Sequence, residues 1–143
     1  MKIYNLPNVL KVFGFRVNSF PEGIAEAFES LIKMVPDGFE RPYYGIGYMD
    51  KDGQIIYKAA ALEKYEAEAE KYKCERYTIE KGEYLTVTVH DWHKKTSSIK
   101  NVFHEIMLDS RVDKTKPCVE WYKNDDEMIC MIQTDRRKNE IAG

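Results

Sequence analysis

Apolar and polar residues alternate along several short stretches of the chain, a pattern that predicts β-strands. Elsewhere apolar residues recur every three or four positions, which predicts amphipathic helices. The two helices are predicted over IAEAFESLIKMV and SIKNVFHEIMLDS. The predicted strands cover residues 9–17, 42–49, 54–61, 84–90, 117–123 and 128–134.

The two halves of the chain show the same order of elements, strand-helix-strand-strand. Pro42 and Pro117 lie 75 residues apart, and so do Phe28 and Phe103. Two copies of one small unit explain this spacing, since one copy alone cannot bury both faces of its strands. We therefore expect a single α+β domain over 1–143. Its duplicated unit would form an antiparallel sheet with two helices on one side and a central ligand cleft.

The predicted boundaries follow from the same pattern. Repeat one covers about 9–61, repeat two about 77–135, and 136–143 form a polar tail. The segment 62–76 between the repeats is rich in Glu and Lys. Its composition suits a charged helix, or a continuation of the third strand that becomes an exposed connector. We favour the connector.

Charge and cysteine content narrow the classes of function. The formal net charge of −2 gives no overall basic field for nucleic acid, and the basic cluster Arg136-Arg137-Lys138 is interpreted as part of the tail. No apolar run is long enough to span a bilayer, and no signal peptide is visible. The three cysteines form no CxxC motif, which favours a reducing compartment. We expect a cytoplasmic protein with no cofactor, no membrane association and no direct nucleic-acid partner.

A carboxylate in an otherwise apolar strand is the main candidate for function. In the predicted strand 117–123, Glu120 shares a face with Cys118 and Tyr122. The sequence leaves two interpretations open: a half-solvated strand face, or a carboxylate that faces a ligand in an aromatic cleft and favours cations. By repeat symmetry the matching positions, where two glycines would leave space for a ligand, are Tyr43, Gly45 and Gly47.

A loop tryptophan and the histidines are weaker candidates. Trp92 follows the strand 84–90 and is either a lid over the ligand or a staple for the second helix. The spacing of His90, His93 and His104 does not direct their rings to one point, so no metal site is expected.

Two motifs carry a resemblance to a known family. Lys81-Gly82-Glu83-Tyr84 opens one strand, and PCVEWY forms another. With the duplication, the whole chain resembles the GyrI-like small-molecule-binding domain, the effector-binding domain of AraC-type and MerR-type multidrug-responsive transcription regulators. The resemblance implies a cleft that binds hydrophobic, often cationic molecules, with a Glu at the position of Glu120 contacting the ligand. No helix-turn-helix is predicted, so the chain resembles the stand-alone form.

The resemblance leaves three functions to compare. The first is binding of a hydrophobic, in some cases cationic, small molecule by a stand-alone protein related to transcription regulators, with Glu120, Tyr122, Tyr43, Gly45, Gly47 and Trp92 as predicted contacts. The second is hydrolysis of reactive electrophiles, with Glu120 as base or nucleophile and Tyr122 as acid or orienting group. The third is a gyrase-inhibitor-like module that uses acidic segments. A separate transcription regulator or gyrase would be the protein partner.

Overall fold

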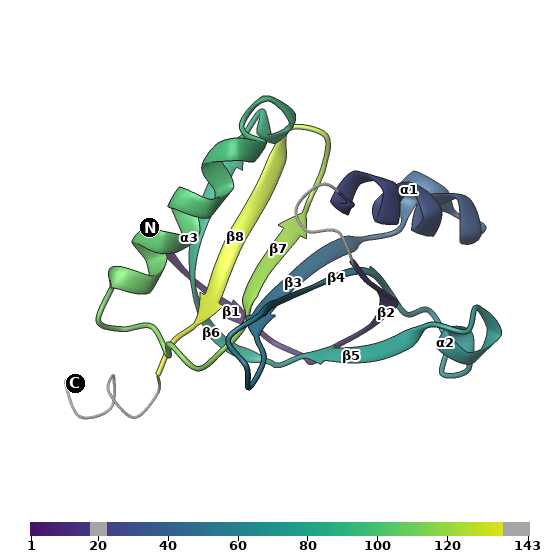
Figure 1. Cartoon of the computed structure of the whole chain (residues 1–143), viewed down its shortest axis with the longest axis horizontal. Coiled ribbons are helices and arrows are strands. Elements are labelled where there is room, and N and C mark those ends of the chain that lie inside the picture. Colours follow the sequence, from purple (N-terminus) through teal and green to yellow (C-terminus); the bar gives the residue numbers. More distant parts are fainter. Residues whose placement is uncertain (18–22, 136–143) are drawn as a thin grey trace. The chain divides into compact units, whose positions relative to one another are not determined.

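The structure, a computed structural model, describes residues 1–17 and 23–135, so the predicted tail and its basic cluster lie outside the described residues. The chain divides into two compact units (Figure 1). Unit 1 comprises Met1–Asn8 and Lys81–Gly143, and unit 2 comprises Val9–Glu80. In each unit, four described strands form an antiparallel arrangement and a helix packs against it. The fold is α+β, as the sequence predicts.

Unit 2 contains the first long helix of the chain. Its described strands lie in the order β3-β4-β2-β5. The elements, in chain order, are β2 (Leu10–Arg16), α1 (Ile24–Met34), the 3-10 turn η1 (Gly38–Glu40), β3 (Tyr43–Met49), β4 (Ile55–Leu62), α2 (Glu68–Lys71) and β5 (Glu75–Ile79).

Unit 1 contains the second long helix and the strand with the candidate carboxylate. Its described strands lie in the order β1-β6-β8-β7. The elements are β1 (Lys2–Leu6), β6 (Gly82–His90), the 3-10 turns η2 (Trp92–Lys94) and η3 (Thr96–Ser98), α3 (Ile99–Leu108), β7 (Cys118–Tyr122) and β8 (Glu127–Gln133).

The two halves of the chain exchange their leading strands. The strand β1 precedes β2 in the sequence, yet it pairs with β6, from Lys2↔Thr86 to Leu6↔Gly82. Likewise β5 precedes β6, yet it pairs with β2. Each unit is therefore completed by a strand from the other half of the chain. The sequence patterns predicted neither β1 nor β5.

The core of unit 1 explains why its strands alternate. Leu85 and Val89 of β6 and Cys130 of β8 belong to one buried cluster that also contains Ile106 of α3. Residues at every second position of β6 and β8 therefore face α3. Ile106 is fully buried, and burying a side chain of this kind stabilises a fold by about 1.5–3 kcal/mol.

A buried ion pair fastens the segment after β4 in unit 2. Arg41 Nη1 lies 2.6 Å from Glu68 Oε1, and the two side chains are 0% and 1% exposed. The same guanidinium donates to the carbonyl of Leu62 at 3.3 Å and to Asp37 at 2.9 Å. The backbone N–H of Lys64 donates to Glu68 as well. The segment predicted as a connector thus continues β4 to Leu62 and then forms the short helix α2, which this network holds.

Within the described residues, no helix is long and apolar enough to cross a membrane.

Candidate functional site

Glu120 lies on the face of the unit 1 sheet that α3 covers. Its strand neighbours on that face, Cys118 and Tyr122, pack against the buried cluster around Ile106. Across the ladder between β7 and β8, Glu120 pairs with Cys130, which is fully buried. The carboxylate itself is half-buried. The shared face predicted for Cys118, Glu120 and Tyr122 is therefore present, and it belongs to the core side of the sheet.

The Glu120 carboxylate is hydrogen-bonded by the phenol of Tyr122. The Tyr122 hydroxyl donates a hydrogen bond to Glu120 Oε1 at 3.1 Å. A hydrogen bond to a charged group is stronger than one between neutral groups, so this contact fixes the orientation of the carboxylate. In a partly apolar site, an oriented carboxylate attracts a cation because pairing offsets the cost of desolvation.

The loop after β6 extends this arrangement. The ring of Trp92 meets the ring of Tyr122 edge-on, with centroids 5.0 Å apart and an interplanar angle of 70°. Its indole N–H donates to the carbonyl of Asn124 at 3.0 Å. Asp126 accepts from the backbone N–H of Asp91 at 2.8 Å. The loop is thereby joined to the β7–β8 turn, and Trp92, Tyr122 and Glu120 form a continuous row.

We call Glu120, Tyr122, Trp92, Cys118 and Cys130 the Glu120 cluster. Burial, followed by the charge of Glu120, raises the pKa of the Cys118 thiol to about 11. The same causes raise the pKa of Cys130. Because the thiolate is the reactive form, both cysteines are poor nucleophiles at neutral pH. They act as small apolar neighbours of the carboxylate.

The other predicted contacts belong to unit 2. Tyr43, Gly45 and Gly47 share one face of β3. The Tyr43 hydroxyl donates to the carbonyl of Gly38 at 2.6 Å, and burial raises the pKa of this phenol to about 12. A Cβ added at Gly47 would meet the Tyr57 ring at 3.8 Å, an ordinary contact distance. Tyr57 therefore borders the space that the glycine leaves.

Sequence reasoning missed two members of the arrangement around the carboxylate. Asn124 accepts the Trp92 indole, and Cys130 stands opposite Glu120. Cys130 lies on the last predicted strand, 128–134. The register that places it here was readable from the turn 124–127, which joins the last two predicted strands. No sequence signal points to the Asn124 carbonyl, because any residue type carries that group.

The histidines take part in local contacts. His90 lies 2.9 Å from Asp126, and the His93 ring stacks on Trp92 with centroids 3.5 Å apart. Among the described residues, no group of three His, Cys, Asp or Glu side chains gathers to hold a metal ion.

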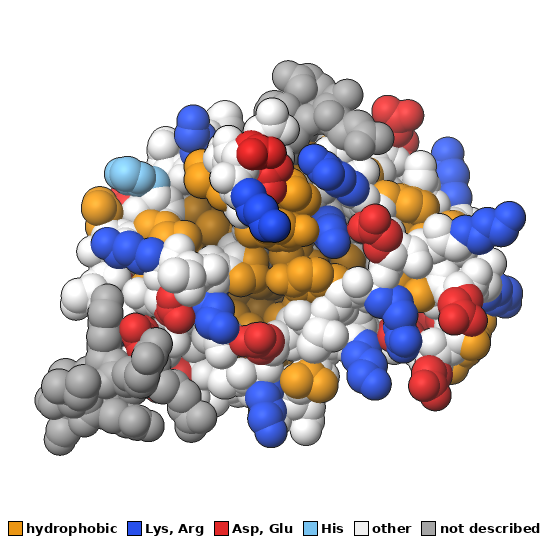
Figure 2. Space-filling view, turned by 60° about the horizontal axis from the view of Figure 1, so that its bottom comes forward, with side chains coloured by type: hydrophobic (Ala, Val, Ile, Leu, Met, Phe, Trp, Pro, Cys, Tyr) orange, Lys and Arg blue, Asp and Glu red, His pale blue; other side chains and the backbone are white. Residues whose placement is uncertain are grey.

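The surface of unit 2 contains a cavity away from Glu120. On the face displayed in Figure 2, basic and acidic side chains alternate, with apolar side chains exposed between them. Unit 2 has a cavity of about 330 Å³, lined by Lys11, Arg76, Tyr77 and Thr78. Two cationic side chains in this lining make it unsuitable for a positively charged ligand.

Comparisons with known proteins give matches in structure. An integron cassette protein from the mobile metagenome of Vibrio cholerae superposes with a TM-score of 0.68 and 14% identity, over 94% of this chain and 95% of that one. The protein SAV2435, in a structure bound to tetraphenylphosphonium, gives a TM-score of 0.64 and 13% identity, over 96% of this chain and 95% of that one.

A third similar structure comes from Staphylococcus aureus and is assigned provisionally to bacterial transcription regulation. Its TM-score is 0.60 at 13% identity, over 94% of this chain and 97% of that one. No family model and no curated protein matches the chain. At these identities the likeness concerns the fold alone, which is the α+β fold that the sequence predicts.

Proposed function

We propose that the protein binds a hydrophobic, cationic small molecule at the Glu120 cluster. The observation that carries the proposal is the Glu120 carboxylate, half-buried and held by the Tyr122 phenol beside the ring of Trp92. A carboxylate supplies the countercharge, and aromatic rings attract the same cation through their faces. A similar fold has been captured with tetraphenylphosphonium, a lipophilic cation, which supports this class of ligand.

We also propose a cellular role and a protein partner. A protein of this kind would sense or sequester lipophilic cations in the cytoplasm, as the effector-binding half of a multidrug-responsive regulator does. The partner would be a separate transcription regulator. No contact among the described residues favours gyrase, the alternative partner.

Calorimetric titration with tetraphenylphosphonium tests the proposal. The Glu120→Gln variant keeps the size of the side chain and removes its charge. We expect its affinity to fall at least about tenfold, because a countercharge near a bound cation is worth more than 1 kcal/mol at the effective dielectric of a protein surface. Equal affinities for the two proteins would contradict the proposal.

Two controls isolate the charge of Glu120. Asp125→Asn removes one negative charge from the exposed β7–β8 turn of the same unit, and its affinity is expected to match the wild type. Triphenylphosphine oxide is neutral and of similar ring content, so Glu120→Gln is expected to leave its weaker binding unchanged. A general loss of folding would lower both titrations together.

The hydrogen bond between Tyr122 and Glu120 also favours a second candidate, hydrolysis of a reactive electrophile. A carboxylate oriented by a phenol is suited to act as a base or nucleophile, with the phenol as proton donor. Turnover of strained electrophiles by the wild type, lost in Glu120→Gln, would support it. Equal rates for both proteins would exclude a catalytic role for Glu120.

A further inference from the structure

The sheet of unit 2 carries a pair of aromatic rings on the face that the helices leave uncovered. Tyr48 of β3 and Tyr77 of β5 are half-buried, with ring centroids 6.5 Å apart and an interplanar angle of 15°. The strand registers place Lys58 of β4 on the same face. The opposite face belongs to α1, because Tyr43 on that side contacts Phe28 of the helix.

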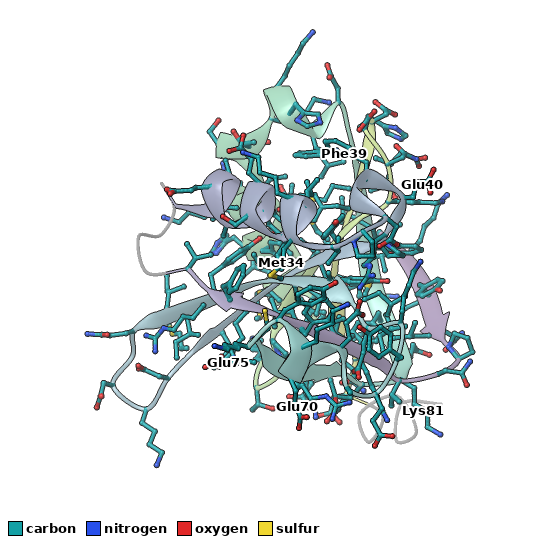
Figure 3. All side chains as sticks on the ribbon, turned by 90° about the vertical axis from the view of Figure 1, so that its right-hand side faces the viewer. Met34, Phe39, Glu40, Glu70, Glu75 and Lys81 are labelled. Carbon is teal, nitrogen blue, oxygen red and sulfur yellow. The ribbon has the colours of Figure 1, made fainter. Side chains whose placement is uncertain are left out.

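The ammonium of Lys58 lies over both rings. Its Nζ is 5.9 Å from the Tyr48 centroid and 5.4 Å from the Tyr77 centroid. The side chain is 18% exposed, while its anionic partner Glu75, 3.4 Å away, is 66% exposed. Figure 3 shows Glu75 at the beginning of β5. An ion pair with an exposed carboxylate contributes little to stability, so the two rings provide the main interaction of the Lys58 ammonium.

The side chain of Lys58 reaches past a neighbouring strand. The strand β2 lies between β4, which carries Lys58, and β5, which carries Glu75 and Tyr77. The Lys58 ammonium lies 3.4 Å from Glu75 and over the Tyr77 ring, so its stem extends across β2 on this face. The backbone thus positions a cation over the aromatic pair from within the chain.

Unit 1 also has a ring pair with a lysine beside it. Tyr4 and Trp121 have centroids 6.0 Å apart, and Lys123 Nζ lies 5.8 Å from the Trp121 ring centroid. Tyr4 is the third residue of β1, and Tyr77 is the third residue of β5, the other exchanged strand. At the offset of 75 residues, Trp121 and Lys123 match Ile46 and Tyr48, so the two arrangements use different positions of the repeat.

We propose that Tyr48 and Tyr77 form a binding site for organic ammonium ions, in which Lys58 is a built-in competitor. The ligand class is a permanently charged alkyl or aryl ammonium ion. Such ions are less strongly hydrated than a lysine ammonium and bind well to ring faces. This site lies in unit 2 and does not depend on the Glu120 cluster. A tethered competitor acts at millimolar effective concentration, so the wild type binds such ions weakly.

Removing the charge of Lys58 tests the proposal. The probe is benzyltrimethylammonium, titrated by NMR into the full chain carrying Glu120→Gln, so that the Glu120 cluster contributes no countercharge. Adding Lys58→Met keeps the apolar stem and removes the ammonium. We expect the affinity to rise about tenfold. Contacts between the methyl protons of the probe and the Tyr77 ring should appear with the gain.

Two further variants separate the rings from general effects. Lys58→Arg retains a cation over the rings and is expected to give no gain. Tyr77→Leu added to Lys58→Met removes one wall and is expected to abolish the gain. The proposal is overturned if Lys58→Met binds no better than its parent, or if the improved binding survives Tyr77→Leu. Failure of tetraphenylphosphonium to bind at the Glu120 cluster would leave these results unaffected.

A measurement on the chain with native Lys58 covers the case in which Lys58→Met fails to fold. Ring currents should move the ε-methylene signal of Lys58 upfield of an exposed lysine. Saturation with benzyltrimethylammonium should return the signal toward the exposed position. A signal that stays upfield while the probe occupies the Tyr77 ring would overturn the competition.

Discussion

The Tyr122 hydroxyl donates its hydrogen bond to a carboxylate two positions earlier on the same strand, that of Glu120. A double-mutant cycle with Tyr122→Phe and Glu120→Leu measures this contact. We expect a coupling of about 1 kcal/mol in the free energy of unfolding, which is measured by urea denaturation. Tyr122→Phe paired with Asp125→Asn should show additive effects. A coupling of zero between Tyr122 and Glu120 would mean that the bond does not orient the carboxylate.

Two roles were predicted for Trp92, a lid over the ligand and a staple for the second helix, and the Trp92→Phe variant distinguishes a structural role from a lid. Trp92→Phe keeps an aromatic ring against Tyr122 but loses the hydrogen bond to Asn124. We expect stability to fall by about 1 kcal/mol and the dissociation rate of tetraphenylphosphonium to stay within a factor of two. The measurements are urea unfolding and stopped-flow fluorescence of Trp121. A faster release with unchanged stability would instead support the lid.

The buried pair Arg41–Glu68 should be far more costly to break than to replace. Arg41→Met leaves the Glu68 carboxylate buried without its countercharge, and we expect a loss of about 3–5 kcal/mol in stability. The double variant Arg41→Met/Glu68→Leu removes both charges and should recover much of that loss. Thermal and urea unfolding of the three proteins give the comparison. Equal stability of the single and double variants would show that the two charges do not depend on each other.

Asp37 predicts an acid-dependent contribution to stability. Its hydrogen bond with Arg41 lowers the pKa of the carboxyl from 3.8 to about 2 in the folded protein. A carboxyl whose pKa is lower in the folded protein stabilises the fold at pH values above its pKa in the unfolded chain. The contribution of Asp37 is therefore nearly complete above about pH 4 and disappears as pH falls toward 2. Asp37→Asn should therefore flatten the stability curve between pH 4 and 2. Asp125→Asn should leave that part of the curve steep, and identical curves for wild type and Asp37→Asn would refute the assignment.

Two glycines on strands that both pair with β4 should lose different amounts of stability when a methyl group is added. At Gly14 a Cβ would collide with the Ala59 carbonyl oxygen and lie 2.9 Å from the Ala60 Cα, whereas at Gly47 the nearest atom is a Tyr57 ring carbon at 3.8 Å. Gly14→Ala should lose about 3 kcal/mol or more, because backbone atoms must move. Gly47→Ala should lose less than about 1 kcal/mol. Urea unfolding distinguishes them, and equal losses would contradict the close approach of β2 and β4.

The Gly47→Ala protein also tests the predicted role of Gly47 in ligand binding. If a ligand approaches the backbone there, its affinity falls while stability is retained. An unchanged affinity for tetraphenylphosphonium would remove Gly47 from the set of contacts.

Sequence periodicity was sufficient for the elements that bury one face. The predicted strand 84–90 is β6, and the second predicted helix is α3, because both show a clear apolar stripe. The strands β1 and β5 were missed since KIYNL and ERYTI are short and mostly exposed, so they alternate weakly. Their pairing comes from partners more than 60 residues away, which no local pattern encodes.

The candidate site was predictable in part for the same reason. The alternation of β7 placed Cys118, Glu120 and Tyr122 on one face without any tertiary information. The Trp92 contact depends on how a loop meets a turn, so its bond to Asn124 was beyond a local reading. The start of α3 shows the same limit. The helix begins at Ile99 without a side-chain cap, and the Ser98 hydroxyl donates to the Lys95 carbonyl.

The exchange of leading strands has a consequence for how the protein is made. Residues 9–80 form one continuous segment, so unit 2 can fold while the ribosome is still translating the remainder. The strand β1 leaves the ribosome before its partner β6, which is the second strand of the other half and emerges about 80 residues later. During that interval the five residues of β1 need to stay unpaired, and the short length of the strand limits pairing with wrong partners.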